Sequence, residues 1–404
     1  MKLIPVIVMA AIAASCGSAK KTADAAPVGP DVVPAVAPEV PQSGNVMKKP
    51  DVSVEKLEFS MNFFKEAYAQ SSKGDIVLSP YSAGMAFSML TDGAKGATRD
   101  GLVASLSRSS YYGEFPYADS LNTVKTANSL WLNKGFKAKD SYISTLKNGY
   151  AAQIYSADAG DPFTPEAING WCSKHTEGLI SHIIDELDPS IRAILMNALY
   201  FKAPWLTAFN EKSTFKEVFH GEAGDAEVDF MHKTSKSFEY ALLPGCKVVN
   251  LPYKNKKYAM LFAIPDDMDK TVKELNAVKF QEILKKLRWG QEVVLSLPKF
   301  KVEFTKVLND IMGKLGASLA FNPAGDLSGI SDEQLFVSKA VQKCVLEVNE
   351  EGAEAAAVTA ILLGRTSVAV QDPPVVIRVD KPFLFFIYDT TSQMILFEGK
   401  IANI

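Results

Sequence analysis

The spacing of apolar residues predicts helices in the first part of the chain and strands in the last part. Leu57, Met61, Phe64 and Tyr68 recur every three or four residues, which is typical of a helix with one buried face. Later in the chain, short runs of β-branched and aromatic residues indicate strands. These runs are 293–297, 345–348, 375–379, 383–388 and 394–397.

A second helix is indicated over 81–92 by the residues at its two ends. Ser79 suits the N-cap, and Pro80 suits the first turn, where its missing N–H group is no loss. Gly93 is placed to end the helix. Helices and strands do not alternate strictly, so the predicted fold class is α+β with more than one sheet.

The first residues predict an export signal. Lys2 precedes an apolar run over 3–14, which is shorter than the about 20 residues that span a bilayer. The run ends at Cys16, in a sequence that resembles a bacterial lipobox, although Ala13 stands where leucine is usual. We expect 1–16 to be a signal peptide whose Cys16 is lipidated; an ordinary signal peptide cut near Ala14 is the alternative.

Residues 17–50 are rich in proline and alanine and contain no aromatic residue. Such a segment buries too little apolar surface to offset its ordering entropy, so we expect a disordered tether. The folded domain is expected over 51–404. The protein is then a secreted lipoprotein, held to a membrane by its N-terminal lipid, in the periplasm or at the outer-membrane or cell surface.

The composition is that of a globular protein and argues against several functions. The chain is 47% hydrophobic and 22% charged, with a net charge of −3, so no binding of nucleic acid is expected. The histidines lack metal-ligand spacing, and the common hydrolase and nucleotide-binding motifs are absent from the sequence. We expect no enzyme activity, no metal and no cofactor. Cys172, Cys246 and Cys344 are expected to be buried free thiols, with a disulfide between two of them left open.

The segment 350–360 suits two different structures. Its alanines and glutamates favour a short helix. However, it directly follows a predicted strand, and Gly352 marks a joint. With the period of a strand, Glu354 would lie on one face and only small uncharged residues on the other, namely Ala353, Ala355, Ala357 and Thr359. A segment that can be loop or strand is a candidate conformational switch.

Glu350–Ala357 resembles the hinge of the serpins, the serine protease inhibitor family. Other segments resemble serpin motifs in the expected order: Asp75–Ser82, Asn197–Trp205, Leu251–Tyr253, Leu297–Phe300, Asp326–Gly329, Asp380–Phe385 and Leu396–Gly399. The resemblance extends from about Leu57 to the end. It implies the serpin fold, with three β-sheets, about eight or nine helices and an exposed reactive-centre loop. The implied hinge residues are Glu350, Gly352, Ala353, Glu354, Ala355, Ala356 and Ala357.

The resemblance implies a protease inhibitor that acts as a suicide substrate. A protease cuts the loop and is trapped as the acyl-enzyme when the cut loop inserts as a strand of the central sheet. The expected partners of this monomer are trypsin-like or elastase-like serine proteases, with papain-like cysteine proteases as a further class. The alternative is a non-inhibitory serpin that acts as chaperone or carrier. The uncharged hinge favours an inhibitor, because a buried charge would oppose insertion.

Family spacing from Gly352 implies that the acyl donor is Thr366, fourteen positions on, and that the cut bond is Thr366–Ser367. A small β-branched donor favours elastase-like or broadly specific proteases. The bond Arg365–Thr366 is one alternative, because trypsin-like enzymes prefer arginine. Use of Ser367 or Val368 is also left open, because the loop from Thr366 to Pro382 is a few residues longer than usual.

The resemblance also implies a buried network, the shutter, that holds the sheet closed. Ser79, Ser82 and Asn197 match it, but Gln342 stands where the family usually has a histidine. Glutamine can both donate and accept, so the network is expected to form and not to respond to pH.

A second closure, the breach, is implied at the top of the sheet. Lys299 and Glu350 match an ion pair there, and Trp205 ends the strand below the point of insertion. The family's heparin-binding helix corresponds to 101–121, whose only basic residue is Arg108, so activation by polyanions is not expected.

Overall fold

The computed structural model describes residues 54–116, 123–176, 178, 180–352 and 373–404. Over these ranges it contains eight α-helices and three β-sheets, which confirms the predicted α+β class. The helices are α1 Val54–Gln70, α2 Pro80–Gly93, α3 Gly96–Ser105, α4 Asp140–Tyr150, α5 Thr164–His175, α6 Met268–Glu274, α7 Ala277–Lys286 and α8 Asn309–Met312.

The three sheets have five, six and four strands. In spatial order, the five-stranded sheet consists of β11 Phe300–Val307, β12 Lys339–Val348, β4 Ala193–Lys202, β2 Thr123–Asn133 and β3 Gln153–Ala157. The six-stranded sheet consists of β1 Ile76–Leu78, β15 Ile395–Ile401, β14 Phe383–Asp389, β9 Tyr258–Pro265, β8 Cys246–Pro252 and β7 Glu239–Leu243. The four-stranded sheet consists of β13 Val375–Arg378, β10 Val293–Pro298, β6 Gly224–Ser235 and β5 Thr214–Gly221.

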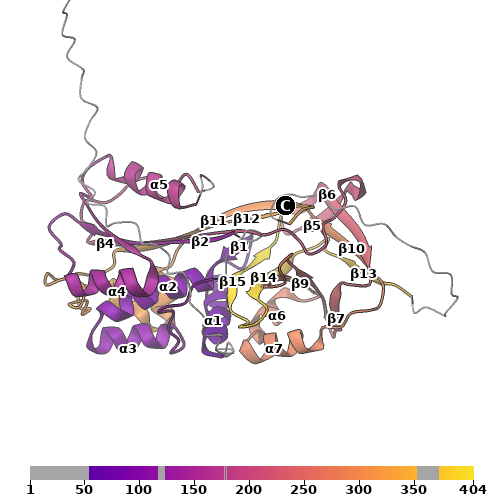
Figure 1. Ribbon diagram of the computed structural model, residues 1–404, viewed down its shortest axis with the longest axis horizontal. Coiled ribbons are helices and arrows are strands. Elements are labelled where there is room, and N and C mark those ends of the chain that lie inside the picture. Colours follow the sequence, from indigo (N-terminus) through magenta and orange to yellow (C-terminus); the bar gives the residue numbers. More distant parts are fainter. Residues whose placement is uncertain (1–53, 117–122, 177, 179, 353–372) are drawn as a thin grey trace, which may run out of the picture.

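The five-stranded sheet runs along the long axis of the molecule, with one face covered along its length and the other covered by α5 toward one end (Figure 1). On one face lies α5, whose Ile168 and Trp171 pack with Met196 of β4 and Val345 of β12. On the other side lie α1 to α4 toward one end and the six-stranded sheet toward the other. The central sheet therefore has apolar layers on both faces where α5 lies, whereas alternate residues of the edge strand β11 are exposed.

The two helices predicted from the sequence are present. Helix α1 buries Leu57, Met61 and Phe64, as their spacing predicts. At the start of α2, the Ser79 hydroxyl accepts a hydrogen bond of 3.1 Å from the N–H of Ser82. All five predicted strand segments lie in β10, β12, β13, β14 and β15, apart from the end residues Val379 and Met394.

Gly93 has a different role from the predicted one. It is the last residue of α2, and Ala94 is the cap. A Cβ atom at Gly93 would lie 2.2 Å from Cγ1 of Ile330. Close packing against Ile330, rather than helix termination, therefore explains the glycine.

The segment 101–121, which corresponds to the heparin-binding helix of the family, does not form one helix over its described residues. Helix α3 ends at Ser105, and the described residues that follow, 106–116, form no helix. Ser107 and Arg108 have φ values of 50° and 64°, which lie in the left-handed region and interrupt a right-handed helix.

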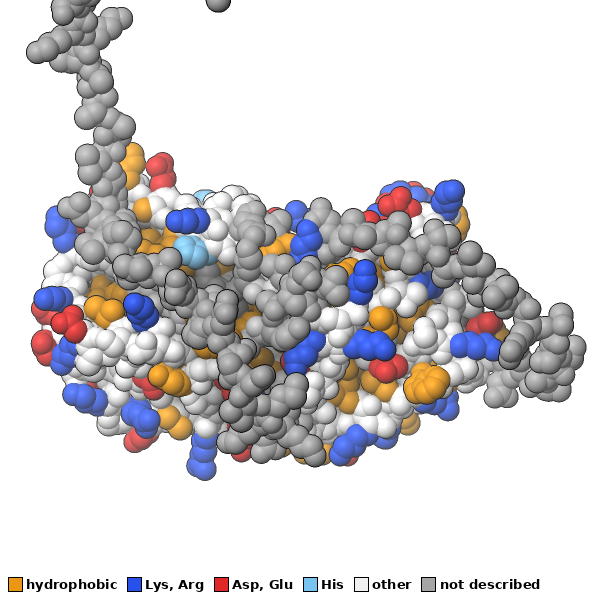
Figure 2. Space-filling view, in the orientation of Figure 1, with side chains coloured by type: hydrophobic (Ala, Val, Ile, Leu, Met, Phe, Trp, Pro, Cys, Tyr) orange, Lys and Arg blue, Asp and Glu red, His pale blue; other side chains and the backbone are white. Residues whose placement is uncertain are grey.

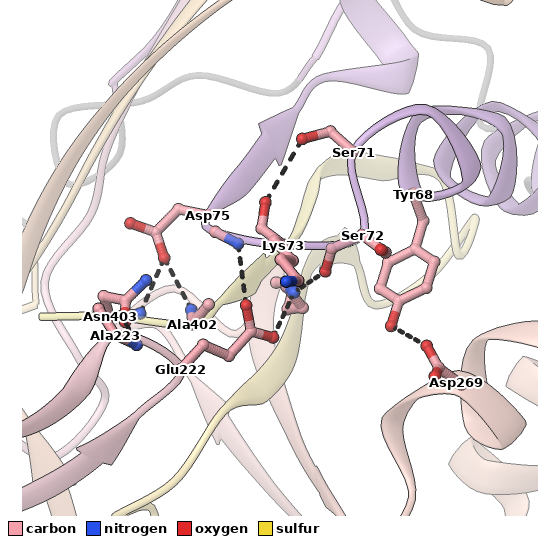
Figure 3. Close-up of polar contacts among 12 residues, drawn as sticks. Tyr68, Ser71, Ser72, Lys73, Asp75, Glu222, Ala223, Asp269, Ala402 and Asn403 are labelled. Atoms are coloured by element: carbon pink, nitrogen blue, oxygen red, sulfur yellow. Dashed lines mark hydrogen bonds and ion pairs between the residues drawn. The ribbon is translucent and has the colours of Figure 1, made fainter.

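The C-terminal strand β15 is tied to the start of the domain by buried polar contacts (Figure 3). Lys400 is fully buried, and its Nζ lies 2.7 Å from Oε1 of Glu222 and donates to the carbonyl of Ser72. Asp75 accepts hydrogen bonds from the N–H groups of Ala402 and Asn403 at 2.7 and 3.0 Å. Residues 373–404 are thus held by the body independently of the chain that precedes them.

Candidate functional site

The seam between β4 and β12 is the unusual feature of the five-stranded sheet. These two strands are parallel, whereas β12 pairs antiparallel with β11, and β4 pairs antiparallel with β2. The parallel ladder runs from Lys339↔Ile194 to Cys344↔Leu199 and stops there, although both strands continue. The seam is therefore unpaired at the end where β12 leads into the segment 349–352.

A buried polar network crosses the middle of this seam. Gln342 on β12 is 1% exposed, and its Oε1 accepts a hydrogen bond of 2.9 Å from the N–H of Ser79. Its Nε2 donates to the carbonyl of Ser79 and to Oδ1 of Asn197, both at 2.9 Å. One glutamine amide thus joins the start of α2, β12 and β4.

The network also includes a residue that the sequence analysis missed. Nδ2 of Asn197 donates to the Ser82 carbonyl at 2.8 Å and to Oδ1 of Asn128 at 2.6 Å. Asn128 lies directly opposite Asn197 in the β2–β4 ladder. The Ser82 hydroxyl is buried and has no partner among the described residues, so Ser82 takes part through its backbone.

An ion pair lies at the open end of the seam. Nζ of Lys299 is 2.9 Å from Oε2 of Glu350, and the side chain of Glu350 is only 8% exposed. The hydroxyl of Thr214, on the four-stranded sheet, donates to Oε1 of Glu350 at 2.7 Å. Burial acts to raise the pKa of Glu350, but the hydrogen bonds from Thr214 and Lys299 outweigh it, so this pKa lies below its ordinary value. Thr214 was not predicted, because only the fold brings β5 to this place.

Trp205 fixes the segment that follows β12. Its indole N–H donates to the carbonyl of Asn349 at 3.0 Å, and its ring stacks on Tyr253 with the centroids 4.6 Å apart. Its backbone N–H donates to the carbonyl of Glu351 at 2.9 Å. The end of β12 is therefore held against the residues that follow β4.

Gly352 lies at the point where the chain leaves this segment. Its φ is +105°, and a Cβ atom there would lie 2.5 Å from both the Ala203 carbonyl oxygen and the Trp205 nitrogen. No other residue type fits both the conformation and the space. The predicted joint at Gly352 is thus a sharp turn packed on the end of β4.

The structure places only some of the predicted site residues. Ser79, Ser82, Asn197 and Gln342 meet at the seam, and Trp205, Lys299, Glu350 and Gly352 meet at its open end. The remaining predicted positions lie outside the described residues: Cys16, Ala353, Glu354, Ala355, Ala356, Ala357, Arg365, Thr366, Ser367 and Val368.

The described ranges also bear on metal sites, membrane-spanning helices and disulfides. They contain no cluster of three or more side chains suited to a metal ion and no helix long and apolar enough to cross a membrane. Cys172, Cys246 and Cys344 are free thiols, of which Cys246 is only partly buried.

The site thus consists of a central sheet whose parallel β4–β12 ladder stops short of the turn at Gly352. The model of the Serpin (serine protease inhibitor) family matches residues 55–404, and the chain belongs to the serpin family. Serpins are in general protease inhibitors rather than enzymes.

Three relatives illustrate the likeness. A serine protease inhibitor of Cyanea capillata is 32% identical over 86% of this chain and 97% of its own. Human leukocyte elastase inhibitor is 30% identical over 87% of this chain and 99% of its own. The crystal structure of tengpin, a thermophilic serpin in the native state, superposes with a TM-score of 0.80 at 26% identity, covering 89% of this chain and 96% of that one.

Proposed function

We propose that this protein inhibits serine endopeptidases by taking its own cleaved loop into the five-stranded sheet. The observation that carries the proposal is the parallel seam between β4 and β12, which is unpaired at the end beside Gly352. The family membership and the names of its inhibitor relatives support the same function.

The pairing directions favour insertion. The chain leaves β12 and turns at Gly352, so a strand that then entered the seam would run antiparallel to both β12 and β4. One parallel pair would be replaced by two antiparallel pairs, which are slightly more stable per residue and bond the new strand on both edges. The uncut sheet therefore holds free energy that cutting the loop can release.

The length of the segment suits the task. Fourteen positions separate Gly352 from Thr366, which is about 46 Å for an extended strand, whereas the ten residues of β12 span about 33 Å. Inserting this segment would carry an acyl-enzyme at Thr366 past the far end of β12. Small residues at Ala353, Ala355 and Ala357 would enter the sheet without burying a charge.

The residues at the reactive bond suggest the target class. We infer cleavage at Thr366–Ser367 by elastase-like proteases. One relative of the chain is named for the inhibition of an enzyme of this class, leukocyte elastase. Cleavage at Arg365–Thr366 would instead select trypsin-like proteases, and papain-like cysteine proteases are a further candidate class.

The test is incubation with an elastase-type, a trypsin-type and a papain-type protease. We expect a complex that survives boiling in detergent with at least one of them. Mass spectrometry after denaturation then identifies the bond, because residues 373–404 stay attached to the native body.

Two arginine substitutions separate inhibition from simple cleavage. Ala353→Arg puts a charge on the inward face and should turn the inhibitor into a substrate. Ala356→Arg, on the opposite face, is the matched control and should still form the complex. Persistent inhibition by Ala353→Arg would contradict the insertion mechanism, and cleavage of the unaltered protein without any stable complex would favour a carrier or chaperone.

A further inference from the structure

An exposed tryptophan lies in a turn whose neighbouring residues carry several positive charges. Trp289, in the turn between α7 and β10, is 76% exposed, more than any other large apolar side chain over the described ranges. Lys236, Lys285, Lys286 and Arg288 are also exposed, and none forms an ion pair with a described residue. We call Trp289 and these four cations the aromatic–basic patch. Figure 2 shows basic, acidic and apolar side chains on the part of the molecule that carries β10 and β13.

The backbone beneath Trp289 is firmly held. Arg288 and Tyr240 exchange two backbone hydrogen bonds of 2.9 and 3.0 Å, and the Arg288 guanidinium lies 4.9 Å from the Tyr240 ring centroid. The N–H of Gly290 donates to the carbonyl of Lys236 at 3.0 Å. Tryptophan and arginine on a rigid support are the residues that dominate binding at protein interfaces, because little ordering entropy is lost on contact.

The same turn is joined to the place where the reactive loop returns to the body. Nε2 of Gln291 donates to the carbonyl of Pro373 at 2.8 Å, and the N–H of Val375 donates to the carbonyl of Glu292 at 2.8 Å. Pro373 is the first described residue after the loop. The aromatic–basic patch and the C-terminal end of the loop are therefore parts of one rigid surface.

The reach of a captured protease covers this surface. Seven positions separate Thr366 from Pro373, which is at most about 23 Å of extended chain. A protease of about 230 residues has a radius of gyration of roughly 17 Å, so its surface extends roughly 20 Å from its centre. When a protease holds Thr366–Ser367 in its active site, the distance between its surface and Pro373 is therefore at most about the radius of the protease.

We propose that the aromatic–basic patch is a docking surface for the body of the target protease, beside the loop that its active site attacks. This inference rests on the proposed function and deepens it: the loop decides which bond is cut, and the patch decides which protease is captured quickly. The fitting partner is a protease whose surface next to the active-site cleft is acidic with an exposed apolar spot, because opposite charges speed encounter and the tryptophan slows release.

The test measures the second-order rate constant for attack on the loop, counting trapped and merely cleaved protein together, with a panel of elastase-, trypsin- and papain-type proteases. We expect Trp289→Ala to lower this rate at least tenfold for one or more proteases that attack the unaltered chain. Val278→Ala, another exposed apolar residue on α7, is 61% exposed and serves as the control with an unchanged rate. The stoichiometry of inhibition should stay the same, because the patch takes no part in insertion.

Each other outcome has a definite meaning. Rates within twofold of the unaltered protein for every protease would overturn the docking surface while leaving inhibition intact. Loop cleavage that Trp289→Ala slows, without any trapped complex, would refute the proposed function and keep the docking surface. If none of the panel attacks the loop, both proposals fail. An unchanged attack rate with lost binding to phosphatidylglycerol vesicles, or with a lost dimer in sedimentation, would reassign the patch to a membrane or to a second copy of the chain.

Discussion

The hydrogen bond between Gln342 and Asn197 offers the sharpest test of where a strand enters. It joins β12 to β4 at 2.9 Å, and both side chains are buried. Neighbouring strands lie about 4.8 Å apart, so a strand inserted between them would move β12 and β4 to about 9.6 Å. The bond would then be broken in the cleaved protein, whereas the bonds from Gln342 to Ser79 need not be.

The expected magnitudes follow from the contacts. Gln342→Ala leaves the Ser79 N–H group and Asn197 Oδ1 without this partner in a buried site, which costs about 1–3 kcal/mol for each group. Most of the destabilisation that comes from losing the bond to Ser79 should appear in both the uncut and the cleaved protein. The coupling between Gln342 and Asn197 should be about 1 kcal/mol in the uncut protein, as for a neutral buried hydrogen bond, and near zero after cleavage.

The assay is a double-mutant cycle with Gln342→Ala, Asn197→Ala and the double variant. Guanidinium unfolding is followed for the uncut protein and for the protein nicked in its loop. A coupling that vanishes on nicking supports insertion between β4 and β12. An equal coupling in both forms would refute it, because the two strands would then still be neighbours.

Three further predictions concern other single residues. The pKa of Glu350 is lowered in the folded state, so its contribution of about 1 kcal/mol is present above the ordinary glutamate pKa and lost as pH falls through the lower, folded value. Glu350→Gln should lower the unfolding midpoint at neutral pH, and this effect should shrink as pH falls through the folded value. Glu398 is buried with neither carboxyl oxygen hydrogen-bonded to a described residue, and burial raises its pKa well above the ordinary value. Where the folded state keeps a proton that the unfolded chain has lost, stability should fall as pH rises, by at most about 1.4 kcal/mol per pH unit for one proton. Glu398→Met should make this fall shallower in denaturant titrations above roughly pH 4.3. We also propose that Cys16 carries the membrane anchor: Cys16→Ser should move the protein from the membrane pellet to the soluble fraction, and an unchanged distribution would contradict the lipid.

Local sequence chemistry predicted the elements better than their contacts. The N-cap at Ser79 and the turn at Gly352 follow from the conformational preferences of single residues, and both are present. Gly93 shows the limit of such reasoning, because packing against Ile330, far along the chain, requires the glycine there. A rule for helix ends cannot anticipate a neighbour more than two hundred residues away.

The polar contacts of the seam show the same limit. Ser79 and Gln342 are 263 positions apart, and only the resemblance to a family placed them together. Asn128 and Thr214 escaped notice because nothing in their own surroundings distinguishes them. Asn128 matters through its register opposite Asn197, and Thr214 matters because β5 passes beside Glu350. Register and sheet-to-sheet packing are properties of the whole fold.

The positions of the two closures fix the order in which a strand can enter. The β4–β12 ladder stops at Leu199 and Cys344, so the first residues after Gly352 would meet strands that are already unpaired. The contacts of Trp205 and the bonds of Glu350 to Lys299 and Thr214 lie at this end of the seam. The Gln342–Asn197 bond lies two residues inside the ladder and would break after the strand has begun to pair. In the proposed mechanism, the outer contacts therefore govern whether insertion starts, and the inner network governs whether it outruns hydrolysis of the acyl-enzyme.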